Sequence, residues 1–268
     1  MVIDAHTHIF NQDSLNEYLG KYPSDVFVCI RFIKDFCGGA FEGRDEELDH
    51  FVESNPNAFL VESIDFEVNI LSQIEELTAK MESSNNIKGI KLYPGYQHFF
   101  PYNERLLPAY VFAHEQNIPV ILHSGAVYQY ENSQAQLQYV NPIYVDEAAT
   151  RYPDTKFIIT HFGFPYIMET AMVLNKNNNV YADISGMLDE DTYEIFKQDI
   201  KRALKYYPGI TNQILFGTDF IGNDTYLNEV ELYVKLVEEL FENVEEREAV
   251  FFKNAQKVFN LADNSQEG

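Results

Sequence analysis

The sequence predicts a (β/α)8 barrel that occupies the whole chain, residues 1–268, as a single domain. Short apolar or β-branched runs alternate about eight times with segments of helical periodicity. Alternation at this spacing is typical of parallel strands joined by helices, and no linker rich in Pro, Gly or Ser divides the chain. About eight such units in about 260 residues fit a closed barrel better than an open sheet.

The expected elements follow one another in regular order. The strands lie near 2–5, 26–31, 58–64, 87–92, 118–122, 156–160, 179–184 and 213–218. The helices lie near 13–20, 45–54, 68–83, 104–117, 141–151, 165–176, 189–206 and 225–240, with one or two more from 245 to the end. The segments "NIPV" at 117–120 and "YPDTKF" at 152–157 place Pro or Asp before a strand, where a helix must stop.

The composition narrows the function classes. The chain has 42 acidic and 19 basic residues and a formal charge of −23, so a nucleic acid partner is not expected. No apolar run approaches the about 18–20 residues that cross a membrane. Cys29 and Cys37 cannot form a disulfide framework, and removal of a leader would remove the first histidines, so we expect a cytoplasmic protein. A small-molecule partner and a homodimer are both compatible with this composition.

Polar side chains end several of the expected strands. In a barrel of this kind the active site is built at the C-terminal ends of the strands. The residues at these ends are His6 and His8 on the first strand, Lys91 and Tyr93 on the fourth, His123 on the fifth, His161 on the sixth and Asp219 on the eighth. Each alone has an ordinary explanation, such as a core histidine bonded to backbone or an aspartate that caps a helix. Together at one end of a barrel, with two histidines two residues apart on one strand face, they predict a metal site.

These strand ends resemble the motifs of the amidohydrolase superfamily, in particular the amidohydrolase 2 branch that contains the aminocarboxymuconate-semialdehyde decarboxylase-like enzymes. The matching segments span nearly the whole chain and are "IDAHTHIF", "GIKLYPGY", "PVILHSG", "IITHFG", "LFGTDF" and "NAQKVFNL". The resemblance implies a single divalent metal ion, zinc before manganese or iron, held by His6, His8, His123 and Asp219. It also implies that His161 lies near the metal.

The chain departs from two groups of relatives. Many decarboxylases of the branch carry Glu in place of the first histidine, so His6 favours hydrolysis. The nuclease-like relatives carry a metal-binding Glu on the fourth strand, where this chain has Lys91. A two-metal nuclease is therefore not expected.

The chemistry of such a site favours hydrolysis. A metal with an open coordination position lowers the pKa of bound water from 15.7 to about 7–9. Asp219 can take the proton of that water, and His161 can polarise a carbonyl or protonate a leaving group. We expect a hydrolase that cleaves a C–N or C–O bond, as in an amide or a lactone, of a small molecule. The alternatives are a decarboxylase or hydro-lyase on the same scaffold, a phosphoesterase with more metal ligands, and a non-catalytic metal-binding protein.

Four residues are candidates for binding the substrate: Lys91, Tyr93, His98 and Arg31. Lys91 has three interpretations: a cation for the substrate, a carboxylated metal bridge, or a lysine whose stem merely packs. Tyrosines 93, 96, 102, 128 and 130 gather on the loops after the fourth and fifth strands, so a carboxylate-bearing, aromatic substrate is compatible with them. The loops at 31–44, 94–103, 124–140 and 220–228 decide specificity. His50 and His114 fall in helices and are expected to be surface or packing residues.

Overall fold

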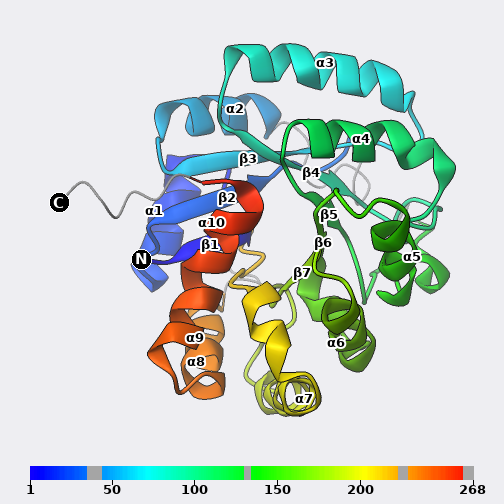
Figure 1. Ribbon diagram of the computed structural model, residues 1–268. Helices are drawn as coiled ribbons and strands as arrows, with labels where there is room; N and C mark the ends of the chain where they lie inside the picture. The colour runs from blue at the N-terminus through cyan, green and yellow to red at the C-terminus, as the bar shows by residue number, and fades with distance from the viewer. Residues whose placement is uncertain (35–43, 130–133, 223–228, 262–268) are drawn as a thin grey trace.

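The computed structural model describes residues 1–34, 44–129, 134–222 and 229–261. Eight parallel strands form one sheet in the order β1 to β8, with helices around it (Figure 1), so the predicted (β/α)8 barrel is confirmed. The strands are β1 Ile3–Thr7, β2 Val26–Ile30, β3 Ala58–Ser63, β4 Ile87–Leu92, β5 Val120–Leu122, β6 Phe157–Ile159, β7 Val180–Asp183 and β8 Ile214–Leu215. Each lies in or beside its predicted range.

The helices lie on the outside of the strands (Figure 1). They are α1 Gln12–Lys21, α2 Asp45–Ser54, α3 Ile70–Ser83, α4 Leu107–Glu115, α5 Ile143–Arg151, α6 Ile167–Lys176, α7 Tyr193–Tyr206, α8 Val230–Leu240, α9 Val244–Glu248 and α10 Asn254–Phe259. The helix α7 begins four residues later than predicted because Asp189 and Thr192 bond to each other's backbone and form a turn. Within the described residues, no helix combines the length and apolarity needed to span a bilayer.

The core has two layers. The larger layer fills the space between the strands and the surrounding helices. The smaller one fills the barrel and includes Ala5, Val28, Ile121 and Tyr181, with the face of α10 packed against it. Gly89 of β4 lies against α10 inside the barrel: a Cβ there would lie 3.7 Å from the Phe259 ring. The helix α10 therefore closes the N-terminal end of the barrel, and only the opposite end is left for a site.

Of the two cysteines the structure describes Cys29, which is a free thiol among the described residues. Cys29 is buried in β2 and unpaired, and burial raises its pKa to about 12. Cys37 lies outside the described residues.

Candidate metal centre

A β-bulge in β1 turns His6 and His8 into the mouth of the barrel. Ile3 and Ala5 face the interior, so strict alternation would turn the next even-numbered side chains outward. Three steps along β1, from Asp4 to Thr7, pair with only two along β2, which inserts one extra residue. The extra residue reverses the alternation, and both imidazoles meet Asp219.

The atoms of this group have the polarity that a cation requires. Oδ1 of Asp219 lies 3.2 Å from Nε2 of His6 and 3.1 Å from Nε2 of His8. The other ring nitrogen, Nδ1, lies 3.0 Å from Asp183 Oδ2 in His6 and 2.8 Å from the carbonyl oxygen of Ile30 in His8. Both partners accept hydrogen bonds, so each Nδ1 carries a proton, and Nε2 is the nitrogen that each ring offers to a metal. Two imidazole nitrogens and one carboxylate oxygen suit zinc, manganese or iron.

The charges support the same interpretation. Burial by itself would raise the pKa of Asp219, but His6 and His8 hold it well below its usual range. Burial lowers the pKa of His8. The ionised carboxylate of Asp219 therefore faces a neutral His8 ring at ordinary pH, whereas Asp183 and Asp219 outweigh the effect of burial on His6 and raise its pKa. A metal at this site would displace the proton from His6 Nε2, because imidazole binds metal in its neutral form.

His161 and His123 lie beside His6, on the other side of the candidate site from His8. The His161 ring lies 5.2 Å from the His6 ring and 5.1 Å from the His123 ring. Nδ1 of His161 lies 3.1 Å from the carbonyl oxygen of Ser185, so that its Nε2 is the nitrogen left for other partners. Nε2 of His123 lies 3.0 Å from the carbonyl oxygen of Ala126. His123 thus lies beside the site, but the groups with all ligand atoms within 4.8 Å of one another do not include it.

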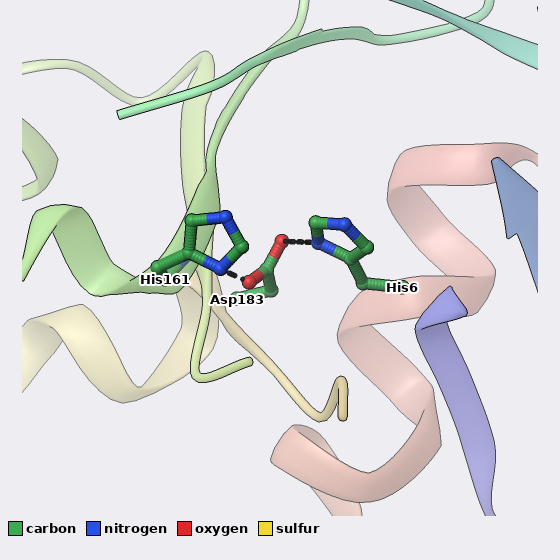
Figure 2. Close-up of side chains that lie close together, drawn as sticks. All are labelled: His6, His161 and Asp183. Carbon is green, nitrogen blue, oxygen red and sulfur yellow. Dashed lines mark hydrogen bonds and ion pairs between the residues drawn. The ribbon is translucent and has the colours of Figure 1, made fainter. Parts of the chain in front are cut away.

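Asp183 connects His6 with His161 and was not identified from the sequence. Figure 2 shows its carboxylate between the side chains of His6 and His161. Its Oδ2 bonds to Nδ1 of His6, and its Oδ1 accepts from the backbone N–H of His161 at 2.9 Å. Burial alone would raise the pKa of Asp183, but the nearby His6 outweighs burial and lowers this pKa, so the carboxyl stays ionised. It ends β7 just as the predicted residues end their own strands, and that position was the available signal.

The backbone at this site is held in uncommon conformations. His161 has φ 57°, Phe162 has φ 45° and Asp219 has φ 61°, in the left-handed region that non-glycine residues rarely adopt; Asn, Asp and His tolerate it best, and a bulky residue such as Phe162 least. Gly186 passes between His161 and Asp219, and a Cβ there would lie 2.5 Å from His161 Nδ1 and 2.8 Å from Asp219 Oδ2. Strained residues of this kind cluster at functional sites because the surrounding structure over-determines them.

Lys91 lies inside the barrel, below the mouth. It is 1% exposed, and burial lowers its pKa to about 8 despite the nearby charges of Asp183 and Asp219. Its Nζ lies 5.3 Å from the centre of the Tyr93 ring. No carboxylate of the described residues comes within 4.0 Å of it, so this ammonium has no ion-pair partner in that part of the chain.

Arg31 and His98 lie away from this group. The Arg31 guanidinium points to the outer side of the sheet, where it bonds to Glu62 at 2.7 Å, Asp45 at 2.9 Å and Asp49. His98 bonds to the carbonyl oxygen of Gln134 at 2.6 Å and stacks on Tyr139 in the loops after β4 and β5.

Two aromatic rings lie against the candidate histidines His8 and His123. Phe32 stacks on His8 with ring centres 3.9 Å apart, and the Tyr96 ring lies 4.9 Å from His123. The hydroxyl of Tyr96 accepts a bond from the backbone of Tyr128, whereas Tyr102 packs on Phe100 farther out. Tyr130 lies outside the described residues.

Comparison with known families gave one match. A family model described as Amidohydrolase matches residues 65–261, a range that contains His123, His161, Asp183 and Asp219 but neither His6 nor His8. Comparison with curated protein sequences gave no significant match.

Several solved structures share the fold. An amidohydrolase from Burkholderia multivorans with bound zinc is 14% identical, with TM-score 0.69 over 98% of this chain and 100% of that chain. A "probable 2-pyrone-4,6-dicarboxylic acid hydrolase" from Acinetobacter baumannii with citric acid bound is 14% identical, with TM-score 0.65 over 97% of this chain and 99% of that chain. A 5-carboxyvanillate decarboxylase from Sphingomonas paucimobilis is 12% identical, with TM-score 0.62 over 93% of this chain and 83% of that chain. At these identities the likeness shows a shared fold.

Proposed function

This chain belongs to the amidohydrolase family of enzymes, and we propose that it is a metal-dependent hydrolase that cleaves a C–N or C–O bond of a small, carboxylate-bearing molecule. One observation carries the proposal: the Nε2 atoms of His6 and His8 converge on Oδ1 of Asp219 while both Nδ1 atoms are tied to acceptors. The zinc bound in the Burkholderia multivorans amidohydrolase supports zinc as the metal, with manganese or iron as alternatives. His123 is proposed as the fourth ligand.

The chain's own residues divide the remaining work. A divalent metal in this site would supply a Lewis acid that activates water and polarises a carbonyl. The second carboxylate oxygen of Asp219, Oδ2, takes the proton of the attacking water. His161 is held through Nδ1 by Ser185, so its Nε2 receives that proton and passes it to the leaving group. Asp183 keeps His6 oriented throughout.

Lys91 is proposed to bind the substrate carboxylate, with Tyr93 beside it. A buried ammonium without a carboxylate partner in the described part of the chain is costly unless a ligand anion neutralises it. We expect Lys91→Met to raise KM for a carboxylate substrate by about 10–100-fold, the worth of a charged hydrogen bond, and to leave KM for its neutral amide nearly unchanged. If Lys91 were a carboxylated bridge, the same variant would instead lose metal.

Metal analysis tests the proposal directly. We expect about one metal per wild-type chain and little in the His6→Ala/His8→Ala double variant, which should stay folded because the barrel has its own apolar core. The matched control is His50→Ala/His114→Ala, which removes two histidines from helices away from the site. Full metal content in the first variant would refute the assignment.

The decarboxylase alternative is separated by product analysis, and the Sphingomonas paucimobilis relative is the reason to keep it. A screen of small lactones, amides and carboxylates in ¹⁸O-labelled water should yield one labelled oxygen in the product. Release of carbon dioxide without incorporation of ¹⁸O would replace hydrolysis by decarboxylation.

A further inference from the structure

The seam where the barrel closes lies at the metal centre. The strand β8 spans only Ile214–Leu215, and among the described residues it is not paired with β1 by a ladder. One isolated bridge, Thr7–Phe220, and a few backbone bonds connect the two sides. His6 and Asp219 face each other across this seam, and their backbones are joined by the bond from the Asp219 N–H to the His6 carbonyl oxygen at 2.7 Å. The position of the backbone at the seam therefore sets the separation of the two side chains.

The carboxylate of Asp4 adds side-chain hydrogen bonds to those that the backbone makes across this seam. Asp4 is fully buried on the outer side of β1 and accepts four hydrogen bonds. Its Oδ1 accepts from the backbone N–H of His6 and of Thr218, each at 3.1 Å. Its Oδ2 accepts from the Thr218 hydroxyl at 2.7 Å and from the Tyr18 hydroxyl of α1 at 2.8 Å. One side chain thus connects β1 and the helix α1 with Thr218, in the segment that follows β8.

These bonds fix the residues on both sides of Asp219. Asp4 holds the N–H and the hydroxyl of Thr218, and the same hydroxyl oxygen accepts from the backbone N–H of Phe220 at 3.2 Å. The backbone of Asp219, between them, has the left-handed φ of 61° and donates to the carbonyl oxygen of His6 at 2.7 Å. A non-glycine residue keeps such a conformation only where its neighbours are held in place.

We propose that Asp4 is a positioning residue that helps to set the separation of His6 and Asp219 across this seam and thereby the affinity and geometry of the metal site. This inference rests on the proposed function, because it assumes that both residues bind metal. A merely structural role for Asp4 would lower thermal stability without changing the metal site of the folded protein.

The test compares metal binding and folding in the same variants. Zinc affinity is measured by competition with a chromophoric chelator, coordination geometry by the visible spectrum of the cobalt-substituted protein, and folding by thermal unfolding of the metal-free protein. We expect Asp4→Ala to weaken zinc binding by about 10–100-fold and to alter the cobalt spectrum. Asp4→Asn keeps an oxygen for the two backbone donors and should restore part of the loss.

Two further variants keep the test decisive. If Asp4→Ala does not fold, Thr218→Val removes the hydroxyl and its two bonds, to the Asp4 carboxylate and from the Phe220 N–H. It leaves the backbone bonds of Asp4 in place, so it should weaken zinc binding by only about 3–10-fold. The matched control is Thr155→Val, which deletes a buried hydroxyl bonded to the carbonyl oxygen of Tyr110 and should lower thermal stability alone.

The outcomes separate this inference from the proposed function. Wild-type zinc affinity and cobalt spectrum in a folded Asp4→Ala protein, or in Thr218→Val if Asp4→Ala does not fold, would overturn the inference and leave the proposed function intact. A wild-type protein that binds zinc but hydrolyses nothing would overturn the proposed reaction, and the affinity comparison would still decide the role of Asp4. A wild-type protein that binds no zinc would overturn both.

Discussion

Replacing Asp183 by Asn changes one atom of the carboxylate but reverses the polarity at His6. The backbone N–H groups of His161 and Ser185 donate to Oδ1 at 2.9 and 3.1 Å, so the amide oxygen must take that position. The amide nitrogen then replaces Oδ2, 3.0 Å from Nδ1 of His6, and points a hydrogen at it. The other neighbour of Nδ1 is the Ser185 hydroxyl at 3.0 Å, which accepts less strongly than a carboxylate. We therefore expect His6 to accept from the amide, which moves its proton to Nε2, the nitrogen proposed to bind metal.

The expected size of the effect follows from the bond that is lost. A hydrogen bond to a charged group contributes about 1.5–3 kcal/mol, and about 1.4 kcal/mol corresponds to a factor of ten, so zinc affinity should fall by about 10–100-fold. Asp183→Ala should be no worse than Asp183→Asn, because water can enter the vacated space and accept from Nδ1. If loss of packing were the only effect, Asp183→Ala would weaken zinc binding more than Asp183→Asn, which is the opposite order.

The assay is chelator competition for zinc at neutral pH, with thermal unfolding of the metal-free protein measured in parallel. The matched control is Asp146→Asn on α5, which makes the same chemical change at a carboxylate paired with Lys176 and Asn177 far from the barrel mouth. Wild-type zinc affinity in Asp183→Asn would refute the argument about the proton on His6.

Three other changes test separate parts of the site. His161→Asn should keep the metal and lower turnover by about 10²–10⁴, whereas unchanged turnover would remove His161 from the mechanism. Arg31→Met should lower the free energy of unfolding by about 1–3 kcal/mol in urea titrations, because Glu62 loses a buried partner. The same variant should leave KM unchanged, and a raised KM would instead support Arg31 as a substrate residue. Gly186→Ala should weaken both zinc binding and stability, because the added Cβ meets His161 Nδ1 at 2.5 Å; unchanged values would show that the loop relaxes without cost.

The sequence alone determined the barrel and the end of it that carries the site. Strand and helix periodicity are local properties, and parallel strands joined by helices place all strand C-termini at one end, so His6, His8, His161 and Asp219 could be grouped before any coordinates. The fold prediction held for every strand, including the short β8, because each apolar run is bounded by polar or turn-forming residues.

Only the tertiary structure decided where those side chains point and what holds them. The bulge in β1 depends on pairing with β2, so no pattern within "IDAHTH" reveals that His6 turns inward. The partner of His6 is Asp183, 177 residues away, and the direction of Arg31 depends on Glu62, 31 residues away. Hydrogen bonds between residues so distant in the chain form only when the strands assemble into the barrel. Sequence periodicity fixes which face of an element is buried but not which partner that face will meet.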